Sequence, residues 1–198
     1  MDRKLLTVGL GALLFIGLAA LSILWFARPA SFRGTAYTEP FPPAPPIDLT
    51  RADGEPFHLS EQRGKIVLLF FGYTSCPDVC PTTMAELKQA MNQLGDQSDR
   101  VQVVFISVDP GRDTPELIQK YVQHFNPNFV GLSGPFDELQ KIWDEYGIYR
   151  AQATTDANYS VDHTARLTLV DADGNLRLSY GFQTPVEDIV HDIKLLLK

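Results

Sequence analysis

The sequence predicts an α/β domain in which helices lie on both faces of a mixed β-sheet, preceded by one N-terminal transmembrane helix. Two continuous apolar runs, Lys65–Tyr73 and Val101–Val108, have the composition of strands that are covered on both faces. Each run is followed by apolar residues at helical spacing, and strand–helix–strand units imply parallel pairing with right-handed crossovers. A hairpin signal late in the chain adds antiparallel strands, which makes the sheet mixed.

The transmembrane helix is predicted from the uncharged run Leu5–Ala27. At about 1.5 Å per residue, a helix of this length covers about 35 Å, whereas the apolar core of a bilayer is about 30 Å thick. A cleaved signal peptide is the alternative, although its apolar segment normally has only about 7 to 15 residues. We therefore expect residues 1–28 to form an uncleaved membrane anchor. Basic residues flank the run on both sides, so their count does not predict its orientation.

A proline-rich segment over residues 29–46 separates this run from a domain at residues 47–198. Its stretch Pro40–Pro46 predicts an extended polyproline spacer of about 20 Å, since this conformation rises about 3.1 Å per residue. A disordered linker with no defined reach is the alternative.

The domain begins with a predicted hairpin, whose strands Ile47–Thr50 and Pro56–Leu59 flank a turn that contains Asp53-Gly54. After the first buried strand, apolar residues between Met84 and Leu94 recur at helical spacing. The second buried strand is followed by Asp113-Thr114-Pro115-Glu116, which is typical of a helix start with a polar cap and proline in the first turn.

A short strand and then an amphipathic helix over Phe136–Tyr146 are expected next. The strands Arg166–Val170 and Leu176–Tyr180 enclose a second Asp-Gly turn and form the late hairpin. Pro185–Leu197 closes the chain as a helix. The order hairpin, strand, helix, strand, helix, short strand, helix, hairpin, helix is a thioredoxin-like outline.

Charge excludes one class of partner. The chain holds 17 Lys and Arg against 24 Asp and Glu, a formal net charge of −7. The acidic excess lies in the domain, because residues 1–33 are net basic. Sequence-independent nucleic-acid binding draws its affinity from Lys and Arg on phosphate, so we expect no nucleic-acid partner.

The two cysteines, Cys76 and Cys80, lie between the first buried strand and the helix that follows it. Functional sites of α/β sheets lie at the carboxyl ends of strands. The start of a helix favours thiolate, which is the form that binds metals or attacks disulfides. The two residues are therefore a redox pair, able to form a disulfide, or half of a metal site, and their spacing alone does not decide between these.

Histidine distinguishes these alternatives. His163 immediately precedes a predicted sheet strand, at the junction that faces the cysteine loop in a thioredoxin-like fold. Thioredoxin places a cis-proline there, whereas no proline occurs between Phe136 and Phe182 in this chain. This replacement favours metal ligation over disulfide exchange. Two thiolates and one imidazole are a soft donor set that suits Cu(I) and can also serve Cu(II), while Zn²⁺ would need a fourth ligand or an open position.

Three motifs occur in order along residues 47–198: Phe71–Pro81 around the cysteines, Ser107–Pro115 after the second buried strand, and Val161–Thr164 around the histidine. With these motifs and the N-terminal apolar run, the chain resembles the Sco/SenC family of copper-binding assembly proteins for cytochrome c oxidase. The resemblance implies that Cys76, Cys80 and His163 are the metal ligands.

Two aspartates are candidates for supporting this site from nearby. The resemblance implies that role for Asp109, which follows the second buried strand; the alternative is a plain turn residue before Pro110. Asp78, between the two cysteines, is the second candidate.

The resemblance implies a copper metallochaperone rather than an enzyme. Such a protein delivers copper to the dinuclear copper centre in subunit II of cytochrome c oxidase, or maintains the thiols of that centre. The domain would lie on the outer face of a bacterial cell membrane, held by a single-pass anchor whose N-terminus is inside.

Two other classes share the predicted fold. A thiol–disulfide oxidoreductase of the thioredoxin class would use Cys76 and Cys80 on partner cysteines, although its motif is normally Cys-x-x-Cys. This activity can coexist with copper binding, because both thiols must be reduced, for example by a thioredoxin-like reductant, before copper binds. A peroxidase of the peroxiredoxin type is disfavoured, because Tyr73 stands where that family has a threonine three residues before its reactive cysteine.

Overall fold

The computed structural model describes residues 16–18, 31–153 and 159–198. Contacts divide the chain into two compact units, Met1–Ser31 and Phe32–Lys198. Most of the expected anchor, residues 1–28, lies outside the described residues, so its assignment stays a prediction. Within the described part of the chain, no helix has the length and apolar character needed to cross a membrane.

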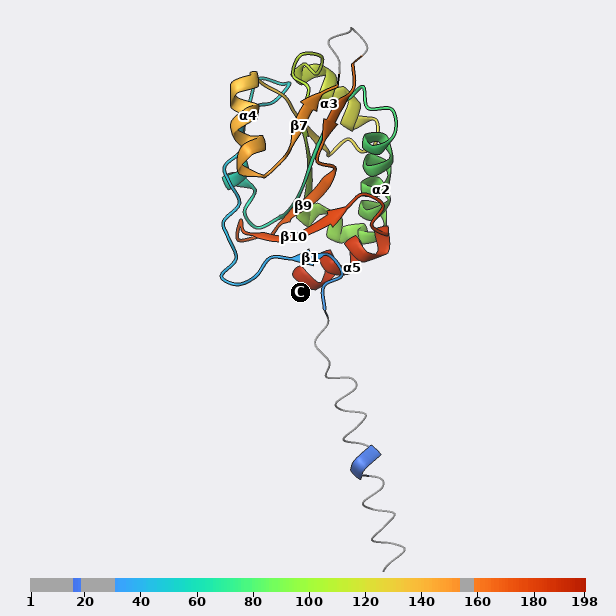
Figure 1. Cartoon of the computed structure of the whole chain (residues 1–198). Coiled ribbons are helices and arrows are strands. Elements are labelled where there is room, and N and C mark those ends of the chain that lie inside the picture. The colour runs from blue at the N-terminus through green and yellow to red at the C-terminus, as the bar shows by residue number, and fades with distance from the viewer. Residues whose placement is uncertain (1–15, 19–30, 154–158) are drawn as a thin grey trace, which may run out of the picture. The chain divides into compact units, whose positions relative to one another are not determined.

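The larger unit is built on a six-stranded mixed sheet (Figure 1). Its strands are β1 (Thr35–Ala36), β4 (Ile66–Gly72), β5 (Val101–Ser107), β6 (Val130–Leu132), β9 (Arg166–Val170) and β10 (Leu176–Gly181). They lie in the order β1-β10-β9-β4-β5-β6. β4, β5 and β6 are parallel, while β9 is antiparallel to β4, and β10 pairs antiparallel with both β9 and β1. The sheet is therefore mixed, as predicted.

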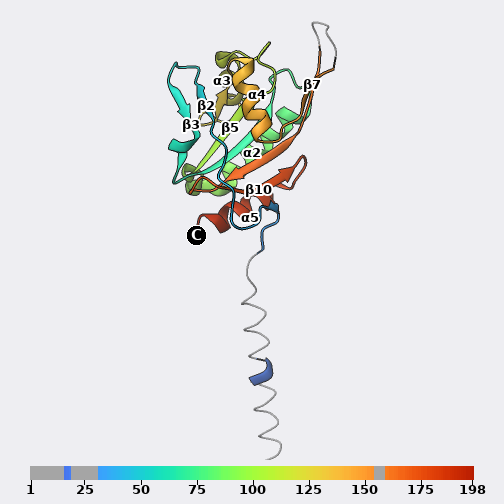
Figure 2. The same ribbon diagram turned by 60° about the vertical axis from the view of Figure 1, so that its left-hand side comes forward.

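Helices cover both faces of this sheet, which confirms the second part of the predicted fold class (Figures 1 and 2). The α-helices are α2 (Val79–Leu94), α3 (Pro115–Gln123), α4 (Phe136–Glu145) and α5 (Val186–Leu196). α2 packs against α5 on one face, while α4 covers the opposite face. Two 3₁₀ helices, η1 (Leu59–Gln62) and η2 (Gly95–Arg100), are short.

The packing of the central strands explains the continuous apolar runs in the sequence. All seven residues of β4 are buried. Successive side chains point to opposite faces, so Phe70 contacts Phe105 of β5 on one face while Phe71 contacts Tyr146 on the other. Because both faces are covered, both carry apolar side chains, and the alternation of a half-exposed strand is missing.

The segment before the expected domain differs from the sequence prediction. We expected a linker over residues 29–46, but the compact unit begins at Phe32, whose side chain packs against the core. β1 pairs with β10 at the edge of the sheet, and Pro43 forms a β-bridge with Asn175. Backbone pairing at this open edge holds the segment, so the stretch Pro40–Pro46 is part of the domain and not a spacer.

Two short hairpins stand outside the main sheet. β2 (Asp48–Thr50) pairs with β3 (Pro56–His58), as predicted. β7 (Arg150–Gln152) pairs with β8 (Val161–His163), and this second hairpin was absent from the predicted element order. His163 is the last residue of β8, shortly before the sheet strand β9.

Candidate metal centre

The two cysteines lie where β4 leads into α2. Cys76 is half-buried in the connecting loop, and Cys80 is fully buried as the second residue of α2. A Cβ atom at Gly72, the last residue of β4, would lie 2.8 Å from the sulfur of Cys80, closer than real contacts allow. Glycine at the end of this strand therefore makes room for the buried sulfur.

His163 faces the cysteines from β8. Its Nε2 lies 4.0 Å from the sulfur of Cys80. Its Nδ1 lies 3.2 Å from the carbonyl oxygen of Thr164, and because a carbonyl only accepts, we assign the proton to Nδ1. Nε2 then presents a lone pair toward Cys80. Burial lowers the pKa of His163, so the imidazole is neutral and able to coordinate a metal at pH 7.

The sulfur of Cys76 lies in an environment that stabilises negative charge. The thiol of Cys80 donates to it, and so do the backbone N–H groups of Cys80, at 3.4 Å, and of Asp78. These hydrogen bonds outweigh burial and lower the pKa of Cys76 to about 5. Donation to Cys76 and burial both raise the pKa of Cys80. The reduced pair thus carries one thiolate, on Cys76, at pH 7.

The separation of the donors fits a shared metal ion. A metal with bonds of about 2.3 Å to sulfur and about 2.0 Å to nitrogen spans at most about 4.3 Å between the two donors, so the 4.0 Å between Cys80 and His163 is short enough. Among the described residues, however, no group of three or more His, Cys, Asp or Glu is already gathered around one point. Metal binding by all three therefore requires a side-chain rotation, which the half-buried Cys76 can supply.

A cleft of about 250 Å³ gives access to Cys76 and His163 from outside. Its other lining residues are mainly apolar, with two acidic side chains among them: Tyr73, Pro77, Asp78, Val79, Val161, Asp162 and Ala165. An ion or a partner side chain can therefore reach two of the three donors without any movement of the core.

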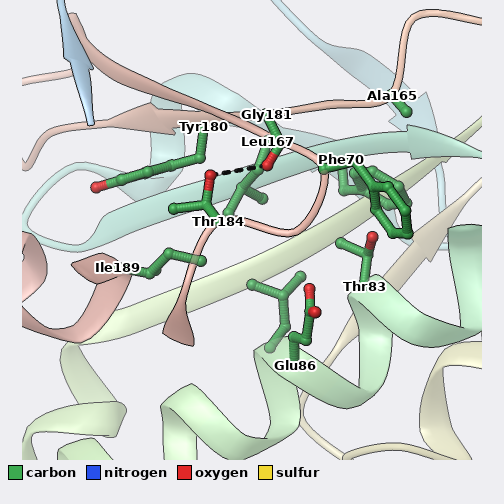
Figure 3. A pocket seen from close by; sticks show the side chains of 11 residues that line it. Phe70, Thr83, Glu86, Ala165, Leu167, Tyr180, Gly181, Thr184 and Ile189 are labelled. Atoms are coloured by element: carbon green, nitrogen blue, oxygen red, sulfur yellow. Dashed lines mark hydrogen bonds between the residues drawn. The ribbon is translucent and has the colours of Figure 1, made fainter. Parts of the chain in front are cut away.

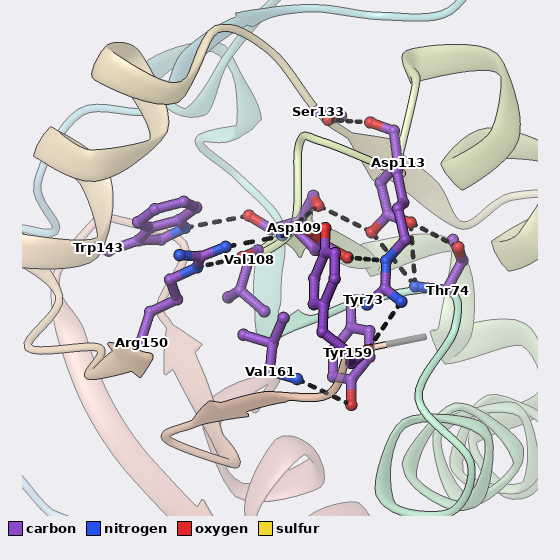
Figure 4. Close-up of polar contacts among 12 residues, drawn as sticks. Tyr73, Thr74, Val108, Asp109, Asp113, Ser133, Trp143, Arg150, Tyr159 and Val161 are labelled. Atoms are coloured by element: carbon purple, nitrogen blue, oxygen red, sulfur yellow. Dashed lines mark hydrogen bonds and ion pairs between the residues drawn. The ribbon is translucent and has the colours of Figure 1, made fainter. Parts of the chain in front are cut away.

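Asp109 lies among several polar contacts beside the site (Figure 4). Its buried carboxylate accepts hydrogen bonds from Nε of Arg112 at 2.5 Å and from the hydroxyl of Tyr159 at 2.6 Å. Arg112 also donates to the carbonyl of Tyr159 at 2.9 Å. Arg150 of β7 donates to the carbonyl of Val108 at 3.0 Å and lies 4.0 Å from Asp109. Asp109 is thus the centre of the contacts that hold hairpin β7–β8, which carries the histidine.

Asp78 lies at the N-cap position of α2. Its side chain makes no capping hydrogen bond, and its carboxylate accepts instead from the hydroxyl of Thr82 at 3.4 Å. Its carboxylate lines the cleft, while its backbone N–H is the group that contacts the sulfur of Cys76.

Asp113 is a buried residue of this region that sequence reasoning placed only within a helix start. The cap of α3 is Thr114, whose hydroxyl accepts from the N–H of Leu117. Asp113 turns inward, where it accepts from the N–H of Thr74 at 3.2 Å and from the hydroxyl groups of Thr74 and Ser107 at 2.5 and 2.8 Å. Burial raises its pKa. This carboxyl therefore holds the start of the cysteine loop.

Tyr73 is the second residue that sequence reasoning missed. Its ring meets the ring of His163 edge-on, with centroids 5.9 Å apart and planes at 83°. Its hydroxyl accepts from the backbone N–H of Val161 at 3.4 Å. The only signal in the sequence is its position three residues before Cys76.

A second hollow, between α2 and β10, has no comparable chemistry (Figure 3). Its walls are mainly apolar, and the single carboxyl among them belongs to Glu86, whose pKa is raised by burial. Its volume of about 10 Å³ is at the lower limit for one water molecule. It is therefore a packing gap and not a ligand site.

Comparison with known proteins identifies the family. A sequence profile described as SCO1/SenC matches residues 36–198. The chain belongs to the SCO1/SenC family. The matched range contains all three candidate donors and both candidate supporting aspartates, and the resemblance predicted from the motifs is confirmed.

Relatives within the SCO1/SenC family cover most of the chain. A protein of Rickettsia felis named SCO2-like is 30% identical over 192 residues, which are 96% of this chain and 92% of that protein. The structure of Bradyrhizobium japonicum ScoI with copper bound is 38% identical, has a TM-score of 0.71, and covers 77% of this chain and 98% of its own. Apo Sco1 of Thermus thermophilus is 37% identical with a TM-score of 0.77, covering 86% and 99%. The thioredoxin-like arrangement of the domain is shared with these proteins.

Proposed function

We propose that this chain is a membrane-anchored copper metallochaperone that serves assembly of the dinuclear copper centre of cytochrome c oxidase. The observation that carries the proposal is the approach of Nε2 of His163 to within 4.0 Å of the Cys80 sulfur, with Cys76 and His163 lining one cleft. A relative with 38% identity has been solved with copper bound, which supports copper as the metal.

The donor set has the chemistry that copper prefers. Two sulfur donors and one imidazole are a soft donor set with a low coordination number. This set suits Cu(I), and Cu(II) can also use it. Cys76 offers a thiolate at pH 7 and His163 offers a neutral ring, whereas Cys80 must lose its proton to bind. A lower pH should therefore weaken copper binding, because protons and metal compete for the same lone pairs.

The two aspartates act on this site through other groups. Asp109 holds hairpin β7–β8 through Arg112 and Tyr159 and so places the histidine. Asp78 contributes its backbone N–H to the Cys76 sulfur.

We infer the partner and the location from the family and from the sequence. Subunit II of cytochrome c oxidase is the expected acceptor of the copper. Leu5–Ala27 is the expected anchor in a bacterial cell membrane, with the N-terminus inside and the domain on the outer face. Cell fractionation and the mass of the mature N-terminus test this location, and a soluble product that begins near Ile23 would show that the segment is a cleaved signal.

A second function, thiol–disulfide exchange with partner cysteines, has its own supporting observation. Cys76 is half-buried at the edge of a cleft and its pKa is lowered to about 5, which are properties of an attacking thiolate. An oxidising compartment favours a disulfide between Cys76 and Cys80, which would remove both sulfur ligands. A thioredoxin-like reductant would then have to act before copper is loaded.

A copper titration of the full chain tests the first function. We expect the reduced protein to bind one copper, with thiolate-to-Cu(II) absorption, and the disulfide form to bind none. The double variant Cys76→Ser, Cys80→Ser should lose both binding and absorption, while His124→Ala, a histidine outside the site, should keep both. Unchanged copper affinity in the double serine variant or in the disulfide form would refute the assignment.

A further inference from the structure

Arg150 stands directly opposite His163 in the hairpin β7–β8. In the next pair of this ladder, the N–H of Thr164 donates to the carbonyl of Tyr149 at 3.1 Å. Hydrogen-bonded and non-hydrogen-bonded pairs alternate between antiparallel strands, so Arg150 and His163 form a non-hydrogen-bonded pair. The backbone of His163 is therefore not tied to the residue opposite it, and the place of the hairpin depends on its other contacts.

The side chain of Arg150 ties the hairpin to the end of the central strand β5. Its Nε donates to the carbonyl of Val108, the residue directly after β5, at 3.0 Å (Figure 4). The guanidinium lies 5.6 Å from the ring centroid of Phe136 and 6.0 Å from that of Trp143. It also lies 4.0 Å from the carboxylate of Asp109. The side chain is 17% exposed, so surrounding residues limit its orientation on nearly every side.

Val108 is also bonded to the strand that leads to the cysteines. Its N–H donates to the carbonyl of Gly72, the last residue of β4, at 2.8 Å. Gly72 lies against the sulfur of Cys80, since a Cβ atom at this glycine would come within 2.8 Å of it. A continuous set of short contacts thus joins the residue opposite His163 to the residue that lines the Cys80 sulfur.

We propose that Arg150 is a positioning residue that sets the separation of the Cys80 and His163 donors by holding β7 to the carbonyl of Val108. Without this hydrogen bond, β7 and β8 can move together away from the cysteine loop, and the 4.0 Å between the two donors is no longer fixed. The proposal deepens the proposed function, because it takes Cys80 and His163 as copper ligands. Arg150 itself offers no lone pair to a metal and acts through His163.

A double-mutant cycle tests this role. Arg150→Met keeps an apolar stem and removes the donor, so a competition titration of the reduced full chain should show Cu(II) affinity about tenfold below the parent. In the His163→Ala background the same substitution should change the affinity less than about twofold, because the ligand that Arg150 places is gone. Equal falls in the two backgrounds, or no fall in the parent background, would overturn the proposal.

Two further variants control the cycle. Arg150→Lys keeps the positive charge and an N–H donor, so it should lose less affinity, and it repeats the cycle if Arg150→Met does not fold. Arg177→Met is the matched control, because the Arg177 side chain is 20% exposed and pairs with Asp171 at 3.1 Å on β10. This variant should keep the Cu(II) affinity of the parent, and a fall equal to that of Arg150→Met would overturn the proposal.

Hydrogen exchange of the reduced apo-protein gives a readout without copper. The N–H of Val161 in β8 donates to the hydroxyl of Tyr73 at 3.4 Å, so it is exposed only when the hairpin leaves the cysteine strand. In Arg150→Met this amide should exchange about tenfold faster, while the amide of Leu69, buried in the middle of β4, keeps the parent rate. Equal acceleration of both amides would show a general loss of stability and overturn the positioning role.

The two readouts separate this proposal from the proposed function. If the parent protein binds no copper, the proposed function fails, while the exchange of the Val161 amide still tests Arg150. If copper binds and the losses from Arg150→Met and His163→Ala simply add, only the role of Arg150 fails.

Discussion

Two buried aspartates each hold a segment that lacks regular structure, one at the sheet edge and one at the cysteine loop. Asp192 on α5 accepts the backbone N–H groups of Arg33 and Gly34, at 3.0 and 2.8 Å. Asp113 accepts the backbone N–H of Thr74 at 3.2 Å. Both aspartates are at most 1% exposed, so in both places a desolvated carboxyl substitutes for the strand partner that the segment does not have.

The two regions differ in what the held segment carries. The segment at residues 32–34, which we call the strap and which leads into β1, contains no candidate metal donor. Thr74, in contrast, stands two residues before Cys76 and opens the loop that leads to Cys80. The same anchoring chemistry should therefore serve stability alone at the strap, and both stability and copper binding at the cysteine loop.

The largest effect on stability is expected at the strap. Asp192→Ala removes the acceptor of two backbone N–H groups and of the Tyr180 hydroxyl, and should lower the free energy of unfolding by about 3 kcal/mol. Copper affinity should stay at the parent value. Urea denaturation and a copper competition titration measure the two quantities, with Asp192→Asn as the control that keeps one acceptor oxygen and loses less stability. A fall in copper affinity in Asp192→Ala would contradict the expectation that the strap serves stability alone.

Asp113→Ala should change both quantities. The N–H and hydroxyl of Thr74 and the hydroxyl of Ser107 lose their acceptor, so we expect a loss of about 2 kcal/mol in the free energy of unfolding. The cysteine loop is then less ordered, and copper affinity should fall about tenfold, which is equivalent to about 1.4 kcal/mol. Asp113→Asn keeps an oxygen toward Thr74 and should lie between the alanine variant and the parent. If Asp113→Ala keeps the copper affinity of the parent, the cysteine loop does not need its hydrogen bonds to Asp113 in order to bind copper.

His163→Ala should affect copper binding and leave stability nearly unchanged. Two thiolates alone can hold linear Cu(I), whereas Cu(II) prefers nitrogen donors and a higher coordination number. We therefore expect the affinity for Cu(II) to fall about tenfold further than that for Cu(I), as measured by competition titrations in both oxidation states. His124→Ala, on α3's C-terminal side, is the control. Equal losses for the two oxidation states, or no loss, would count against His163 as a ligand.

The same comparison explains which features could be predicted from the sequence. β4, α2 and β5 were predicted because their signals are local: a continuous apolar run, apolar residues at helical spacing, and another apolar run. Cys76 and Cys80 were proposed as donors because they follow a buried strand at its carboxyl end, and His163 because it immediately precedes the predicted strand Arg166–Val170. Their role as metal ligands stays a prediction.

The hydrogen bonds by which Asp113 and Asp192 hold these two segments were not predictable, because the residues that they join lie far apart in the sequence. Asp113 and Thr74 are separated by 39 positions, and Asp192 and Gly34 by 158. Proline content indicates that a segment is extended, but it does not indicate that the segment pairs with the edge of a sheet. In the same way, Asp113 beside Thr114 and Pro115 matches a helix start, and only the burial of its side chain reveals a different partner.

Asp113 is also expected to give the smallest and most specific effect, a dependence of stability on pH. Burial raises the pKa of its carboxyl above the ordinary value of 3.8, the hydrogen bonds from Thr74 and Ser107 oppose this, and the charge of Asp109 adds to the rise. In the pH range just above 3.8, the folded protein therefore holds more protons at this position than the unfolded chain does. Its contribution to stability is complete below that range and declines as the pH rises through the pKa of the folded state.

Asp113→Asn has no titrating group at this position and shares the other ionisable residues with the parent, so the difference between the two proteins isolates the carboxyl. Urea denaturation of both, at pH 4.5 and at pH 7, should show the advantage of the parent over Asp113→Asn shrinking as the pH rises. An advantage that grows with pH would mean that the folded state stabilises the charged carboxylate. Charge-assisted hydrogen bonds to the Asp113 carboxylate would then hold the cysteine loop. The free-energy cost of burying Asp113 would no longer distinguish the cysteine loop from the strap.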